Sequence, residues 1–138
     1  MAGQQQHPII QLLKRDSRYS LDAYQFVRDA LSYAHDELGM GRAAEVSETD
    51  EGTAEAHLTG QQLCQAIRQY AQEQFGLMAH VVLRNWGVTR TGDFGEIVYN
   101  LIEIGLMKKS ESDRREDFDD VYDFAEAFDR HFKITESK

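Results

Sequence analysis

Apolar residues recur at helical spacing in several separate stretches of this chain, and this repeat constrains the fold more than any other feature. The clearest stretch lies between Ser20 and Gly39, where the apolar positions are Tyr24, Val27, Leu31, Ala34 and Leu38. Steps of three and four residues place them on one face of a helix. Ser20 is a favourable N-cap, and Gly39 is a typical helix stop. The pattern predicts a long helix with one buried face.

Start and stop signals predict helices on both sides of this one. Pro8 begins a short apolar run, and proline is favoured at the first position of a helix. Thr59 and Gln62 have the spacing of a capping box, and the helix after them is expected to end near Gly76. Another helix follows at once and is expected to stop at Gly87.

Asp93 and Glu96 repeat the capping spacing in acidic form and predict a helix over 94–104. After it, 106–109 and 117–122 are interpreted as two strands of a hairpin, and Asp123 as the N-cap of a last helix. A competing interpretation makes 118–132 one continuous helix, because its apolar residues also fit that period. Helices followed by a hairpin suggest a winged-helix arrangement.

One domain is expected from the length of 138 residues. We place it at 8–132, as a mainly α, compact helical domain with a minor α+β element, the C-terminal hairpin. Residues 40–58 show no periodicity and are predicted to be a flexible acidic insertion, and 1–7 and 133–138 are predicted to be tails.

Charge excludes some classes of partner. The net charge is −9, and residues 116–138 alone carry eight acids and three bases. Such a surface is repelled by nucleic acid and by anionic membranes. No stretch has the length of a membrane span or the pattern of a signal peptide, and the one cysteine gives no disulfide framework. We therefore expect a cytoplasmic protein.

Specific catalytic motifs are not recognised in the sequence, and no cofactor or metal is predicted. No two of the five histidines are three or four positions apart, which a local metal pair would need. Cys64 is predicted to be a buried, inert thiol. An enzyme with a dispersed site, built around His80 and carboxylates, remains an alternative.

The acidic and aromatic C-terminal third leads the functional prediction. We expect a non-catalytic protein-interaction module, with a basic protein as its partner. The surface would be formed by Asp119, Asp120, Tyr122, Asp123 and Phe124.

A nucleic-acid-binding regulator is the other alternative. Lys108, Lys109, Arg114 and Arg115 would lie on the hairpin and contact phosphates, with 94–104 as the recognition helix. That helix would present Glu96 and other polar side chains to DNA, which disfavours this alternative.

Several short segments together also resemble a known family. They are Arg15-Asp16-Ser17-Arg18-Tyr19, Asp22-Ala23-Tyr24, Phe75-Gly76, Asn85-Trp86-Gly87-Val88, Asp93-Phe94-Gly95-Glu96-Ile97-Val98, and Asp117-Phe118 with the residues up to Phe124. The chain resembles, over about 8–132, a small family of uncharacterised proteins from the Planctomycetes and Verrucomicrobia group of bacteria. The resemblance implies a bacterial, cytoplasmic protein and transfers no functional residue. The stretch 40–58 is longer than expected for that family.

Overall fold

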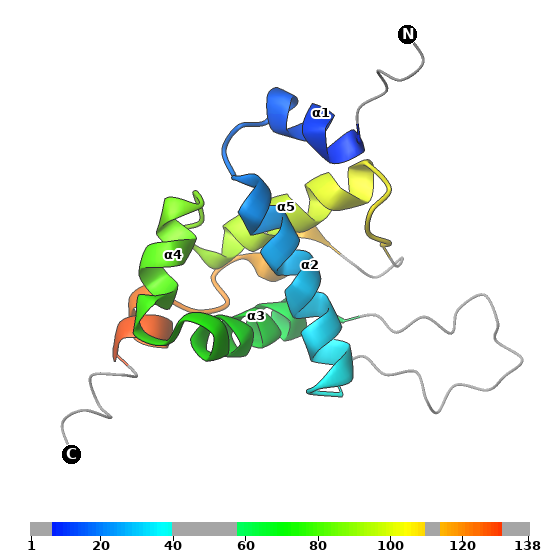
Figure 1. Ribbon diagram of the computed structural model, residues 1–138. Coiled ribbons are helices and arrows are strands. Elements are labelled where there is room, and N and C mark those ends of the chain that lie inside the picture. The colour runs from blue at the N-terminus through cyan, green and yellow to red at the C-terminus, as the bar shows by residue number, and fades with distance from the viewer. Residues whose placement is uncertain (1–6, 40–57, 110–113, 131–138) are drawn as a thin grey trace, which may run out of the picture.

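Helices account for most of the residues that the structure, a computed structural model, describes: 7–39, 58–109 and 114–130. The α-helices are α1 (Pro8–Arg15), α2 (Leu21–Asp36), α3 (Gly60–Phe75), α4 (Ala79–Asn85) and α5 (Thr91–Glu103), shown in Figure 1. Three shorter helical segments are η3 (Gly76–Met78), η4 (Arg115–Phe118) and η5 (Ala125–Arg130). The mainly α prediction is confirmed.

Predicted caps determine where several of these helices begin and end. The Ser20 hydroxyl accepts a hydrogen bond from the Ala23 N–H at 3.3 Å. Thr59 and Gln62 form the reciprocal capping box at 2.9 and 3.0 Å. Gly76 ends α3 with a φ of 54°, a conformation that favours glycine.

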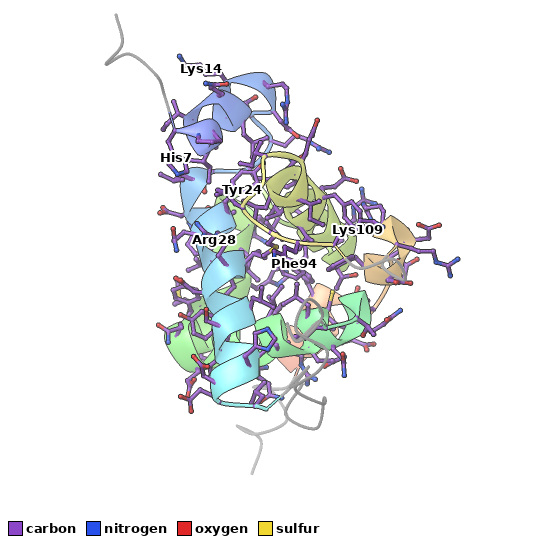
Figure 2. All side chains as sticks on the ribbon, turned by 90° about the vertical axis from the view of Figure 1, so that its right-hand side faces the viewer. His7, Lys14, Tyr24, Arg28, Phe94 and Lys109 are labelled. Carbon is purple, nitrogen blue, oxygen red and sulfur yellow. The ribbon has the colours of Figure 1, made fainter. Side chains whose placement is uncertain are left out.

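The helices pack with α2 lying across α3 and α5, as Figure 1 shows. The short α4 connects the end of α3 to the start of α5, and η5 packs against α4 and α3. Tyr24 and Phe94 are fully buried, and in Figure 2 they lie inside the bundle while Lys14 lies on its outside. No helix among the described residues is long and apolar enough to cross a membrane.

The predicted hairpin over 106–122 is wrong, and with it the winged-helix arrangement. Within the described residues 106–109 and 114–122 there is no strand. Instead Arg115–Phe118 forms η4, because Phe118 is buried against α3 and α5 rather than paired along an extended partner. The continuous helix over 118–132 is also wrong, because the chain turns at Asp120, whose φ is 52°.

The other predictions for the chain ends have mixed outcomes. Asp123 is confirmed as a cap, since its carboxylate accepts a hydrogen bond from the Glu126 N–H at 3.1 Å. The predicted insertion 40–58 lies outside the described residues except for Leu58, which is buried in the core. Of the predicted tails, the described part is His7, whose Nδ1 accepts a hydrogen bond from the Ile9 N–H and caps α1.

Two glycines let η4 approach the helices closely. A Cβ placed on Gly95 would lie 2.8 Å from the Phe118 Cβ, and one on Gly60 would lie 2.8 Å from the Asp117 Cβ. Real carbon atoms do not approach so closely, so any larger residue there would force η4 away from α3 and α5. The position of the segment after η4 therefore depends on these glycines.

We expect Gly95→Ala to destabilise the fold by about 1–3 kcal/mol, the usual cost of overpacking, although alanine is the better helix former. Urea denaturation measures the change. Ser32→Ala, at an exposed position of α2, is the control and should have little effect or stabilise slightly. A Gly95→Ala protein as stable as the control would contradict the close approach of η4.

Candidate functional site

The polar side of α5 is bound by the last residue of α1 and by the segment that joins α1 to α2. Four side-chain hydrogen bonds connect them: Tyr19 with Asp93 at 2.6 Å, Arg18 with Glu96 at 3.2 Å, Asp16 with Asn100 at 3.1 Å, and Arg15 with Glu103 at 3.2 Å. The four α5 residues are spaced by three or four positions and so share one helix face. We call these four pairs the α5 clasp. The face predicted to read DNA therefore binds the chain itself.

Asp93 is the buried end of the clasp. Besides the Tyr19 hydroxyl, its carboxylate accepts hydrogen bonds from the N–H groups of Thr89 and Arg90 at 2.8 and 3.3 Å. The prediction of Asp93 as the N-cap is wrong, because α5 begins two residues earlier, at Thr91. As the third residue of the helix, Asp93 accepts hydrogen bonds from the N–H groups of Thr89 and Arg90, which precede α5, and not from N–H groups that follow it in the helix. Burial and the Asp93 hydrogen bond raise the pKa of Tyr19 well above its ordinary value.

Asp16 and Arg18 form the outer part of the clasp. Two guanidinium nitrogens of Arg18 donate to the two Asp16 oxygens at 2.9 and 2.7 Å. Chiefly through these hydrogen bonds, Arg18 lowers the pKa of Asp16 well below its usual range, and Asn100 adds to the effect.

A cavity of about 480 Å³ opens where the start of α5 meets the segment after η4. We call it the acidic cavity, and it is lined by Thr89, Arg90, Thr91, Gly92, Asp119, Asp120, Tyr122, Asp123 and Phe124. All five residues predicted to form an interaction surface are among them. The structure thus brings the predicted residues together, but around a hollow rather than on a flat patch.

Two contacts hold the walls of the cavity in place. The Thr91 hydroxyl, which is buried, accepts a hydrogen bond from the Val121 N–H at 3.0 Å. Arg115 donates to Glu96 on α5 and to Asp119 at 2.8 and 2.9 Å. The bend that carries the aspartates is therefore tied to α5 by a backbone donor and by a guanidinium group.

The three aspartates of the cavity differ in what they contact. Asp119 pairs with Arg115, and Asp123 caps η5. Asp120 is exposed at the turn, in the left-handed region that aspartate and asparagine tolerate better than most residues. Of the three, Asp120 is the one placed to meet a partner without a structural change.

The two predicted aromatic residues are not on the surface. Phe124 is buried and packs edge-on against Phe128, with ring centroids 5.3 Å apart. Tyr122 is half-buried, and its hydroxyl donates to the Cys64 carbonyl at 2.8 Å. Burial raises the pKa of Tyr122 well above its ordinary value. Both rings line the acidic cavity and give it a small apolar wall beside the carboxylates.

The basic residues of the nucleic-acid alternative do not form a cluster on a hairpin. Arg115 is occupied by Glu96 and Asp119, and the strands that would carry the group are not formed. Lys108, Lys109 and Arg114 are exposed, and Lys109, labelled in Figure 2, belongs to the segment that follows α5.

The residues considered for catalysis are packed among apolar groups. The His80 ring lies 5.7 Å from the Phe124 ring, between centroids, and 6.4 Å from that of Phe128. Cys64 is fully buried, and burial raises the pKa of its thiol, which is the predicted environment of an inert cysteine. Within the described ranges, no three histidine, cysteine, aspartate or glutamate side chains are placed to hold a metal ion.

The structure also has an aromatic surface that the sequence does not predict. Five aromatic residues, from α2, from α3 and from the C-cap of α4, form a row that we call the aromatic strip: Tyr33, Tyr70, Phe26, Phe75 and Trp86. All but Phe26 are half-buried. Each residue fits the apolar face of its own helix, so only the packing of α2 on α3 and α4 shows that the rings meet at the surface. No local pattern could have identified the strip.

No protein-family model, no curated protein and no solved structure matches this chain. The resemblance to the family of the Planctomycetes and Verrucomicrobia group therefore stays a prediction.

Tyr19→Phe should destabilise the fold by about 1.5–3 kcal/mol, because it removes a hydrogen bond to a buried carboxylate. The free energy of unfolding, measured with urea, tests this. Tyr70→Phe, a half-buried tyrosine outside the α5 clasp, is the control and should lose less. Equal losses in the two variants would show that Asp93 does not depend on the Tyr19 hydroxyl.

The clasp also predicts a dependence on pH. Because the pKa of Asp16 is lower in the folded state than its unfolded value of about 3.9, Asp16 stabilises the fold above that value, and this contribution is lost as the pH falls through the folded pKa.

We therefore expect the difference in unfolding free energy between the wild type and Asp16→Asn to be largest near neutral pH and to shrink below about pH 4. Urea denaturation at a series of pH values measures it, and Ser17→Ala, at the exposed neighbour, should follow the wild type. A difference that stays constant down to about pH 2.5 would contradict the charged pair.

Proposed function

We propose that this domain is a non-catalytic protein-interaction module that holds a basic segment of a partner protein at the acidic cavity. The observation that supports this most is that three carboxylates, Asp119, Asp120 and Asp123, line one concave site. One guanidinium group, that of Arg90, is also among the lining residues, with its Nε 4.0 Å from Asp93. The walls therefore carry more negative than positive charge.

The composition of the walls suits a lysine or arginine side chain. Carboxylates form strong hydrogen bonds with guanidinium and ammonium groups. Tyr122 and Phe124 supply apolar wall against which the methylene stem of such a side chain can pack. The net charge of −9 attracts basic partners over longer distances.

The remaining parts of the proposal rest on the sequence. The absence of a recognised catalytic motif favours binding over catalysis, and the family resemblance implies a bacterial cytoplasm as the compartment. Arg115, the basic residue best placed near α5, is occupied by carboxylates, so the geometry gives no support to nucleic acid as the ligand.

Asp120→Asn tests the cavity with little risk to the fold, because asparagine also tolerates the left-handed conformation. Peptides selected from a displayed random library on the wild-type protein should be rich in lysine and arginine. Their affinity, measured by titration calorimetry, should fall about fivefold in Asp120→Asn and should weaken as salt rises.

Glu116→Gln is the matched control, since Glu116 is an exposed acid of η4 that does not line the cavity. Its affinity for the same peptides should remain that of the wild type. If both substitutions lower the affinity equally, the effect comes from the net charge of the protein and not from the cavity. Unchanged binding in Asp120→Asn would reject the acidic cavity as the binding site.

A further inference from the structure

Two large apolar side chains protrude into solvent at the turn between α3 and α4. Leu77 is 61% exposed and Met78 is 54% exposed. The turn itself requires neither, because its geometry is provided by Gly76 with its positive φ. Apolar side chains grouped at the surface are typical of a site that a partner covers.

These two residues follow Phe75, a member of the aromatic strip, with Gly76 between. The rings of Phe75 and Trp86 meet edge to face at 5.7 Å, and both pack on Phe26, at 5.6 and 5.4 Å between centroids. The row continues to Tyr70, whose ring centroid lies 5.1 Å from that of Phe26, and then to Tyr33, whose ring centroid lies 5.0 Å from that of Tyr70. An apolar end and a tyrosine end therefore belong to one surface over α2, α3 and α4.

The tyrosine end is surrounded by acids. The negative charges of Glu73 and Glu37 act on the Tyr33 hydroxyl. Asp29 and Glu73 act on Tyr70. Burial first, and then these negative charges, raise the pKa of both tyrosines above its ordinary value.

We propose that the aromatic strip, with Leu77 and Met78, is a docking surface for a cationic amphipathic segment of a partner protein. Its apolar side chains pack on Phe75, Leu77 and Met78, and its lysine or arginine side chains lie on the tyrosine rings beside the acids. Aromatic faces and carboxylates both attract cations, and aromatic rings and methionine are enriched at protein interfaces.

Charge selects this occupant over the chain's own copies. Two copies meeting at the strip would bring Asp29, Glu37 and Glu73 of each against those of the other, and each chain carries a net charge of −9. The segment 40–57 is no better suited by charge, since it has five acids and one base. The surface lies on other residues than the acidic cavity, so the inference goes beyond the proposed function.

Trp86 provides the readout, because it is the one tryptophan of the chain and belongs to the strip. The probe is a synthetic amphipathic helix of about 14 leucines and lysines, with blocked ends and no aromatic residue. Titrating it into the full-length protein should change the Trp86 emission saturably and less steeply at high salt. The same peptide with glutamate in place of lysine should cause no change.

Variants at exposed positions locate the binding. Leu77→Ser with Met78→Ser should lower the affinity for the probe about tenfold, because two apolar contacts are lost. The matched control is Ile10→Ser with Leu21→Ser, which removes two exposed apolar residues elsewhere and should bind like the wild type. Glu37→Gln with Glu73→Gln should lower the affinity for the probe about fivefold.

Three results would overturn the inference: equal binding of the glutamate peptide, unchanged binding in Leu77→Ser with Met78→Ser, or a dimer in sedimentation that this pair of substitutions dissolves. The last would make a second copy the occupant. Asp120→Asn should bind the leucine–lysine probe like the wild type. The acidic cavity and the aromatic strip can therefore fail separately.

Discussion

The buried Asp93 carboxylate is the interaction on which the rest of the structure depends. A charged group inside a protein is tolerated only when donors surround it, and here the Tyr19 hydroxyl and the backbone N–H groups of Thr89 and Arg90 do so. These donors come from the segment before α2 and from the turn before α5. One side chain thus fixes the start of α5, and the wall of the acidic cavity begins at the same turn.

Helix α5 is held from two sides by different chemistry. Its polar face is occupied by the α5 clasp, and its small residues, Gly92 and Gly95, admit Arg115 and Phe118 of η4. Several of the segments on which the family prediction rests contact one another in the folded chain. Their contacts with one another in the fold are structural.

Local signals predicted the parts of the fold that depend on local chemistry. Ser20 and Asp123 act as caps because a short polar side chain can reach its own helix start without help from elsewhere. The hairpin prediction failed because Phe118 finds its place between glycines of α3 and α5, contacts far away in the sequence. For the same reason the acids of the site were predicted, whereas the burial of Phe124 was not. Exposure depends on which helix covers a ring.

The α5 clasp joins residues that are 74 to 88 positions apart in the chain. Residues 15–19 are synthesised early, yet their partners on α5 leave the ribosome only after α2, α3 and α4 have been made. Closing so long a loop is entropically costly and slow, so docking of this segment belongs among the last steps of folding. A nascent chain that stops before α5 cannot complete its core, so the domain needs all of its helices in order to fold.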